Sequence, residues 1–158
     1  MSREPTALRD AYLAALKMLA RRELSEAQVR QRLARKGHDE DAIEAAVARL
    51  RAERAIDDER VAEAIAHTQV SLKRRGPRRI RQQIEQAGIA RHTARRATEA
   101  IFEDVDAEAL LASSLAARLR GRARIADAAE FRRLYRYLIS QGFDADRVLA
   151  ALKARRRG

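Results

Sequence analysis

Cysteine is absent from the 158-residue sequence, and proline, glycine and aromatic residues are scarce. Without cysteine the chain forms no disulfide, no thiolate nucleophile and no cysteine zinc site. Two prolines and six glycines leave few of the tight turns that an all-β fold needs. The longest clean apolar run, residues 11–16, is too short to cross a bilayer, and the first five residues lack the basic-then-apolar order of a secretory signal. We therefore expect a cytoplasmic protein that makes no membrane contact.

Helix-forming and charged residues dominate what is present. Hydrophobic residues make up 46% of the chain and charged residues 36%, and Ala, Leu, Arg and Glu, all good helix formers, are the most abundant types. This composition predicts an all-α fold. The formal net charge is +11, which is typical of proteins that bind nucleic acid, an acidic protein surface or a membrane face.

A short pattern occurs three times along the chain. In each copy, two apolar residues lie four apart and a glycine follows four residues later, which predicts one helix face that ends at a left-handed cap. The copies are residues 25–37, 76–88 and 130–142, with the apolar pairs Val29/Leu33, Ile80/Ile84 and Leu134/Leu138.

Each copy is flanked by two further amphipathic stretches, one before it and one after its glycine. The preceding stretches cover roughly residues 6–23, 58–75 and 106–121. A unit of about 50 residues buries too little apolar surface to be stable alone, so stacking of neighbours is expected. The sequence thus predicts an elongated, curved array of three three-helix repeats, with boundaries at 1–56, 57–104 and 105–158.

Capping residues mark where several of these helices begin. Ser25, followed by Gln28, has the pattern of a capping box. Asp39 and Asp144 lie two residues after their glycines, where a side-chain oxygen accepts from free backbone N–H groups. The second repeat has Ala90 at that position and is predicted to lack the cap.

The positive charge is concentrated in the middle repeat. Residues 1–63 have no net charge, residues 64–98 carry +8 and residues 99–158 carry +3. Eight cations of the middle segment form the predicted partner-binding or DNA-binding site. They are Lys73, Arg74, Arg75, Arg78, Arg79, Arg81, Arg91 and Arg95.

Position along the helices separates a structural role from a binding role. Residues 73–75 are predicted to end a helix, where cations complement the macrodipole, so both roles stay open for them. Arg78, Arg79 and Arg81 fall in the first turns of the next helix, where positive charge opposes the dipole. We interpret these three as an exposed binding surface. Arg95 has Glu99 one helical turn away. An ion pair between them would occupy the Arg95 charge, which weakens the prediction that Arg95 binds a partner.

The same segment lacks the residues that other chemistries need. No aromatic residue lies between residues 64 and 98, so the surface suits phosphates or carboxylates and not stacked bases. The three histidines, at 38, 67 and 92, are isolated and have no metal-ligand spacing. No P-loop or calcium loop is present. We therefore expect no enzymatic activity, no metal site and no cofactor.

Three motifs give the chain a resemblance to a known family. They are Asp-Asp-Glu-Arg at 57–60, Gly-Pro-Arg-Arg-Ile at 76–80 and Gly-Ile at 88–89. Together with the segment 19–37, they are similar to the RecX regulatory proteins, modulators of the RecA recombinase. The similarity extends over about residues 8–156. Val61 and Ile84 depart from the usual Phe and Leu, and residues 65–72 are less basic than in typical members.

The resemblance implies a non-catalytic regulator. Such a protein binds RecA filaments on DNA, lies in the filament groove across neighbouring subunits, and inhibits the recombinase, ATPase and coprotease activities that serve DNA repair and the SOS response. Arg74, Arg75, Arg78, Arg79 and Arg81 are then the expected principal contacts, with DNA phosphates touched as part of the filament.

Two alternatives remain open from the residues alone. Three-helix units with basic second helices superficially resemble helix-turn-helix readers, so the chain could be a stand-alone DNA- or RNA-binding module. It could also be an adaptor for another acidic protein. We expect a monomer, because no coiled-coil heptad pattern requires a dimer.

Overall fold

The computed structural model describes residues 5–157, and this part of the chain contains nine α-helices and no β-strand. The helices are α1 (Thr6–Arg21), α2 (Glu26–Arg35), α3 (Glu40–Ala52), α4 (Asp58–Ser71), α5 (Pro77–Gln86), α6 (Arg91–Asp104), α7 (Ala107–Leu119), α8 (Ala128–Ser140) and α9 (Ala145–Arg157). The predicted all-α fold is confirmed. No helix within residues 5–157 is long and apolar enough to span a bilayer.

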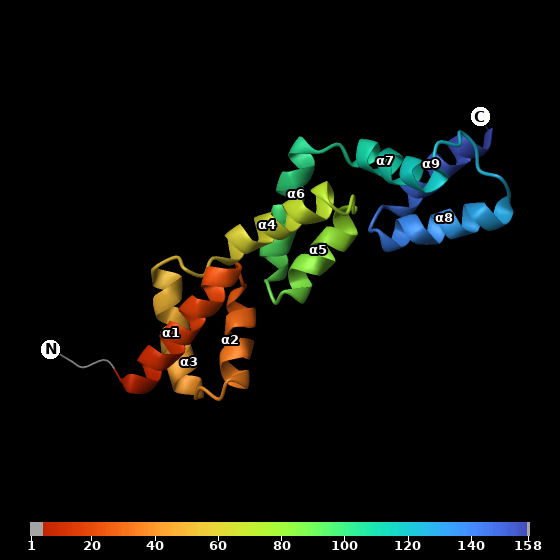
Figure 1. Cartoon of the computed structure of the whole chain (residues 1–158). Coiled ribbons are helices and arrows are strands. Elements are labelled where there is room, and N and C mark those ends of the chain that lie inside the picture. The colour runs from red at the N-terminus through yellow and green to blue at the C-terminus, as the bar shows by residue number, and fades with distance from the viewer. Residues whose placement is uncertain (1–4, 158) are drawn as a thin grey trace.

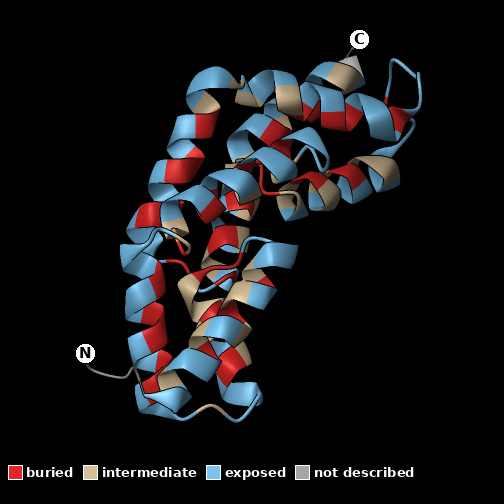
Figure 2. Ribbon diagram, turned by 60° about the vertical axis from the view of Figure 1, so that its left-hand side comes forward, coloured by how far each residue is buried: buried red, intermediate tan, exposed pale blue. Residues whose placement is uncertain are grey.

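The helices pack in three groups of three. Helices α1–α3, α4–α6 and α7–α9 each surround a core of their own, and the extensive helix–helix contacts lie inside these groups. Figure 1 shows the groups following one another, with the termini at opposite ends, and Figure 2 shows the array bending. The predicted elongated, curved array of three-helix repeats is confirmed. Fully buried side chains include Leu24, Leu33 and Leu50 in the first core, Ile80 and Ile84 in the second, and Leu115, Leu138 and Leu152 in the third.

Side-chain caps start most of the helices. Ser25 Oγ accepts from the Gln28 N–H at 3.1 Å while the Gln28 side chain accepts from the Ser25 N–H at 3.0 Å, which is the predicted capping box. Asp39 caps α3 as predicted, and Ala90 provides α6 with no side-chain cap. Each such bond satisfies a backbone donor that the helix itself leaves free. Helices α4, α7, α8 and α9 begin in the same way at Asp57, Asp106, Asp127 and Asp144.

Left-handed glycines end the second helix of every repeat. Gly37, Gly88 and Gly142 have φ angles of 90°, 82° and 98°, a conformation that glycine adopts without steric cost. The pattern of two apolar residues and a glycine therefore predicted the ends of α2, α5 and α8 correctly.

The end of α4 differs from the sequence prediction. The helix was expected to continue to residue 75, but it ends at Ser71. Arg74 has a φ of +51°, so the chain turns through a left-handed residue although no glycine is present. As a consequence, Lys73, Arg74 and Arg75 lie in the loop between α4 and α5 and not in the last helical turn.

Repeats 1 and 2 meet where the C-terminal end of α5 contacts the N-terminal end of α2. The Ser25 hydroxyl donates to the Ala87 carbonyl in the interior of this joint. Gly88 lies so close to the Ala27 side chain that a Cβ at position 88 would overlap it. Around the joint, the Glu26 N–H donates to Asp58 Oδ1 at 2.9 Å, which links α2 to α4.

Repeats 2 and 3 meet through the equivalent contact, with the C-terminal end of α8 against the N-terminal end of α5. The Gly76 N–H donates to the Gln141 carbonyl at 2.8 Å, and the Arg78 N–H donates to the Gly142 carbonyl at 3.1 Å. A Cβ at position 76 would lie 2.7 Å from the Gly142 carbonyl and 2.8 Å from the Phe143 ring. The next repeat thus supplies the acceptors that the α5 start lacks.

Candidate functional site

The eight predicted site residues fall into two groups at opposite ends of α5. Six lie on the α4–α5 loop and the first half of α5, and Arg91 and Arg95 begin α6, just after α5 ends (Figure 1). Ten residues of α-helix are about 15 Å long. The structure therefore does not gather all eight into one cluster. The first group contains Lys73, Arg74, Arg75, Arg78, Arg79 and Arg81, and we call it the loop–α5 basic surface.

Four members of the loop–α5 basic surface are open to solvent. Lys73, Arg74, Arg78 and Arg81 are exposed, and none of them forms an ion pair with any residue in the described range. Within that range the middle repeat thus leaves four exposed cations without a carboxylate partner. They are the residues best placed to meet an external anion.

Arg75 and Arg79 are less accessible than the sequence prediction requires. Both are half-buried, and the Nε atom of each is buried without a hydrogen-bond partner among the described residues. Arg75 Nη1 donates to Gln69 Oε1 at 2.9 Å, and the main chain of Arg79 lies directly against Gly142. Arg79 therefore belongs to the joint with repeat 3, and Arg75 lies in the loop that leads into it. Sequence periodicity within one repeat carries no information about that contact.

Arg91 and Arg95 form long, exposed ion pairs. Arg91 lies 3.9 Å from Glu85, a pair that the sequence analysis did not predict. Arg95 lies 4.0 Å from Glu99, which is the pair that the sequence suggested. The Arg91 side chain is 93% exposed. Exposed pairs of this length are worth well under about 1 kcal/mol, so an anionic partner can displace the carboxylates at little cost.

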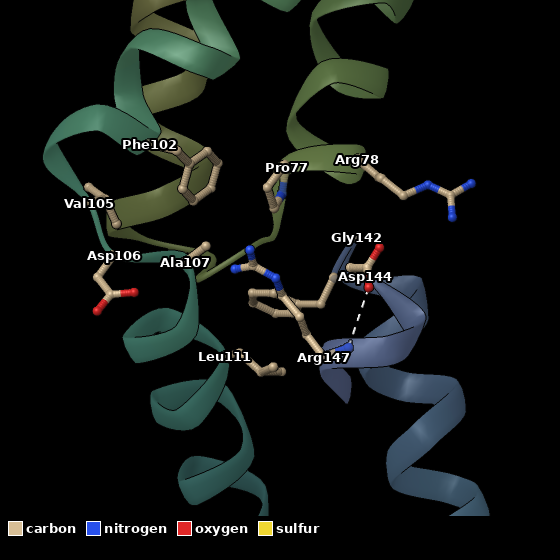
Figure 3. Close-up of a pocket in the computed structure, with 11 residues that line it drawn as sticks. Pro77, Arg78, Phe102, Val105, Asp106, Ala107, Leu111, Gly142, Asp144 and Arg147 are labelled. Carbon is tan, nitrogen blue, oxygen red and sulfur yellow. Dashed lines mark hydrogen bonds between the residues drawn. The ribbon is translucent and has the colours of Figure 1, made fainter. Parts of the chain in front are cut away.

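A pocket of about 570 Å³ lies at the joint between repeats 2 and 3 (Figure 3). Its walls come from the start of α5, the end of α6, the start of α7 and the turn between α8 and α9. Phe102, Leu111 and Phe143 give it an apolar lining. Arg147 points into it, whereas Arg78 and Asp106 point away. The wall also contains Asp144, whose carboxylate accepts from the Asp146 N–H at 3.0 Å and so caps α9.

The acidic clusters of the sequence serve as helix caps. Asp57 Oδ1 accepts from the Glu59 N–H at 3.0 Å, and Asp39 Oδ1 accepts from the Asp41 N–H at 2.9 Å. In the part of the chain that the structure describes, no three His, Asp or Glu residues lie close enough together to hold a metal ion.

A second basic cluster, in repeat 1, was missed by the sequence analysis. Its residues line a pocket of about 660 Å³ between α1 and α2. Summing charge over residues 1–63 concealed it, because the acids of α3 and α4 cancel its charge. A narrower window, residues 17–36, has seven cations against two acids and would have indicated it. We call this cluster the α1–α2 basic pocket, lined by Lys17, Met18, Arg21, Arg22, Arg32, Arg35 and Lys36.

Comparison with known proteins gives matches over nearly the whole chain. Residues 11–50 match the family model described as RecX, first three-helix domain, and residues 57–97 match RecX, second three-helix domain. The chain is 36% identical over 150 residues to the regulatory protein RecX of Halorhodospira halophila, covering 94% of this chain and 88% of that protein. It is 33% identical over 135 residues to the RecX of Syntrophotalea carbinolica, covering 85% and 88%.

Solved structures share the fold. The crystal structure of RecX from Lactobacillus salivarius superposes with a TM-score of 0.75 at 22% identity, covering 94% of this chain and 96% of that one. A second crystal structure, of a regulatory protein RecX, gives a TM-score of 0.76 at 24% identity, covering 93% and 71%.

Proposed function

Because the chain belongs to the RecX family of regulatory proteins, we propose that it binds RecA filaments on DNA and inhibits their recombinase, ATPase and coprotease activities. In this way it modulates DNA repair and the SOS response. The protein acts without catalysis and without a cofactor, as a monomer in the cytoplasm. Its repeats are those bounded at 1–56, 57–104 and 105–158.

The observation that carries the proposal is the loop–α5 basic surface at the centre of an elongated array. Lys73, Arg74, Arg78 and Arg81 are exposed and unpaired within the described range, and a DNA-bound filament offers phosphates along its whole length. An extended molecule with a central cationic surface suits an extended anionic groove better than a compact ligand. Arg91 and Arg95 contribute a second, weaker contact, while Arg75 and Arg79 shape the joint beside it.

The direct test is the DNA-dependent ATPase of RecA preassembled on single-stranded DNA, with this protein added below stoichiometry at two salt concentrations. We expect inhibition at low salt that declines as salt rises, because exposed charge pairs are screened within about 8–10 Å at 0.1–0.15 M. DNA binding with no effect on a cognate RecA would favour the stand-alone nucleic-acid module instead.

Charge reversal of Arg78 and Arg81 tests whether these two residues are needed for inhibition. Position 78 is in the first turn of α5, where a carboxylate is favoured over a cation by the macrodipole. Arg78→Glu/Arg81→Glu is therefore expected to retain helicity and stability while inhibition falls at least about tenfold, as for the loss of two charge contacts.

A matched control separates this effect from net charge. Arg9→Glu/Arg124→Glu makes the same charge change at two exposed positions outside the middle repeat and is expected to keep wild-type inhibition. Full inhibition by a folded Arg78→Glu/Arg81→Glu protein would contradict the assigned role of the loop–α5 basic surface.

A further inference from the structure

We propose that the α1–α2 basic pocket is a phosphate-binding site that holds the backbone of a nucleic acid. The site lies in repeat 1, outside the loop–α5 basic surface, and its binding requires no RecA. It would give the chain a nucleic-acid contact of its own at one end of the array.

The pocket is formed where two helices bring their cations together. Lys17, Arg21 and Arg22 come from α1 and its end, and three more cations come from the C-terminal half of α2 and its cap. Met18, 8% exposed, is the only uncharged lining residue. The cavity, about 660 Å³, is within the size range of ordinary ligand sites.

The nearby carboxylates are engaged elsewhere. Glu23 and Glu26, between the two sets of cations in sequence, pair with Arg60 and Arg51. These pairs join α2 and the α1–α2 loop to α3 and α4. None of the six pocket cations forms an ion pair with a residue of the described range. A repeat without net charge thus separates its charges and leaves six positive ones around one cavity.

Helix stabilisation explains only part of this arrangement. Arg21, Arg32 and Arg35 lie in the last turns of their helices, where cations complement the macrodipole. That role needs no convergence of two helices on a common cavity, and Lys17 lies before the last turn of α1. Six like charges around one cavity repel one another, and a bound polyanion removes that repulsion.

The lining selects the class of anion. Four of the six cations are arginines, whose planar forks match phosphate oxygens with two parallel hydrogen bonds. The lining contains no aromatic ring for stacking and no amide for reading base edges. A backbone of closely spaced phosphates balances six positive charges better than a single carboxylate. The ligand class is therefore phosphate, presented by a polynucleotide and recognised without regard to sequence.

Binding of the full chain to a fluorescent 20-nucleotide oligothymidine, without RecA, tests the proposal. The variant Arg21→Gln/Arg35→Gln changes two exposed pocket residues, and circular dichroism checks that its helicity is retained. We expect its Kd to rise about tenfold and the slope of log Kd against log salt to become shallower by about 1.4, the value for two lost single-strand phosphate contacts. The control, Arg124→Gln/Arg132→Gln, removes the same charge from repeat 3 and is expected to change Kd less than about twofold.

Competition identifies the source of the phosphate. Unlabelled oligonucleotide that displaces the probe far better than inorganic tripolyphosphate at equal charge supports a polynucleotide site. Preferential displacement by tripolyphosphate assigns the pocket to a soluble phosphate and overturns the nucleic-acid assignment. Preferential displacement by polyglutamate, or equal weakening in pocket and control variants, overturns the phosphate site altogether. RecA is absent from this assay. A negative result here would therefore overturn the phosphate site without bearing on the proposed inhibition of RecA, and the reverse also holds.

Discussion

Gly37 and Gly142 hold the same position in their repeats but have different surroundings. Both end a second helix with a left-handed φ, yet a Cβ at position 37 would meet nothing within 4 Å, whereas one at position 142 would overlap the main chain of Arg79, 2.9 Å from its Cα. The difference arises because only Gly142 docks against another repeat.

Substitution of these two glycines by alanine isolates the strength of the joint. Gly37→Ala is expected to cost about 1 kcal/mol for the left-handed backbone alone. Gly142→Ala carries that cost and a further about 1–3 kcal/mol from the overlap. Urea unfolding followed by circular dichroism measures both. Equal losses in the two variants would mean that the joint between repeats 2 and 3 is not formed in solution.

At the scale of single residues, the sequence indicated which side chains of the site are charged but not which of them are accessible to solvent. Lys73, Arg74 and Arg78 are exposed as the predicted site requires, because nothing packs on them. The partial burial of Arg79 depends on a turn that lies more than 60 residues away in sequence. Composition and local periodicity do not encode such a contact.

Among the elements, the start of α8 is held by hydrogen bonds to the Glu130 carboxylate, and their contribution to stability depends on pH. We call this contact the Glu130 clamp. Arg122 and the Ala126 N–H both donate to Glu130, which lowers the pKa of Glu130 to about 2, with the Arg122 bond as the larger cause. A carboxyl whose pKa is lower in the folded chain stabilises the fold above its ordinary value of 4.5. This contribution is lost as the pH falls from 4.5 toward about 2.

Replacement of Glu130 by glutamine tests the clamp. Glu130→Gln is expected to flatten the decline of the unfolding temperature between pH 4.5 and about 2, because the titrating group is gone. Glu108→Gln removes a carboxyl that is 73% exposed and 4.0 Å from Arg147, and should leave the wild-type decline. A Glu130→Gln protein with an unchanged pH profile would exclude the clamp.

The helix boundaries show what local sequence determines. Caps such as Ser25 and Asp39 and the left-handed glycines act within one helical turn, so their positions could be predicted. The end of α4 could not be predicted, because the left-handed residue that follows it is Arg74. Glycine usually occupies such a position, and its presence in the sequence is what allows the end of a helix to be predicted.

At the scale of the whole molecule, the array is longer than a compact domain of equal mass. A compact chain of 158 residues has a radius of gyration of about 15 Å. We expect small-angle X-ray scattering to give a clearly larger value at the monomer mass of 17.9 kDa. A value near 15 Å would mean that the repeats fold back on one another in solution.

The number of repeats could be predicted from the sequence, whereas their joints and the α1–α2 basic pocket could not. The repeat count follows from a pattern that each unit carries in full. The joints and the pocket depend on how separate helices meet, as when the Ser25 hydroxyl donates to the Ala87 carbonyl or Lys17 and Lys36 line the same pocket from different helices.

The N-cap residue of α8, Asp127, has a consequence for self-association. Both joints place a proton donor, the Ser25 hydroxyl or the Gly76 N–H, against a bare carbonyl of the neighbouring turn. At the start of α8 stands Asp127, whose carboxylate already accepts from the Glu130 N–H at 2.8 Å. If the Gly37 turn of a second copy approached there, oxygen would face oxygen and negative charge. We therefore expect this aspartate to disfavour head-to-tail association of two copies through the kind of contact that joins the chain's own repeats.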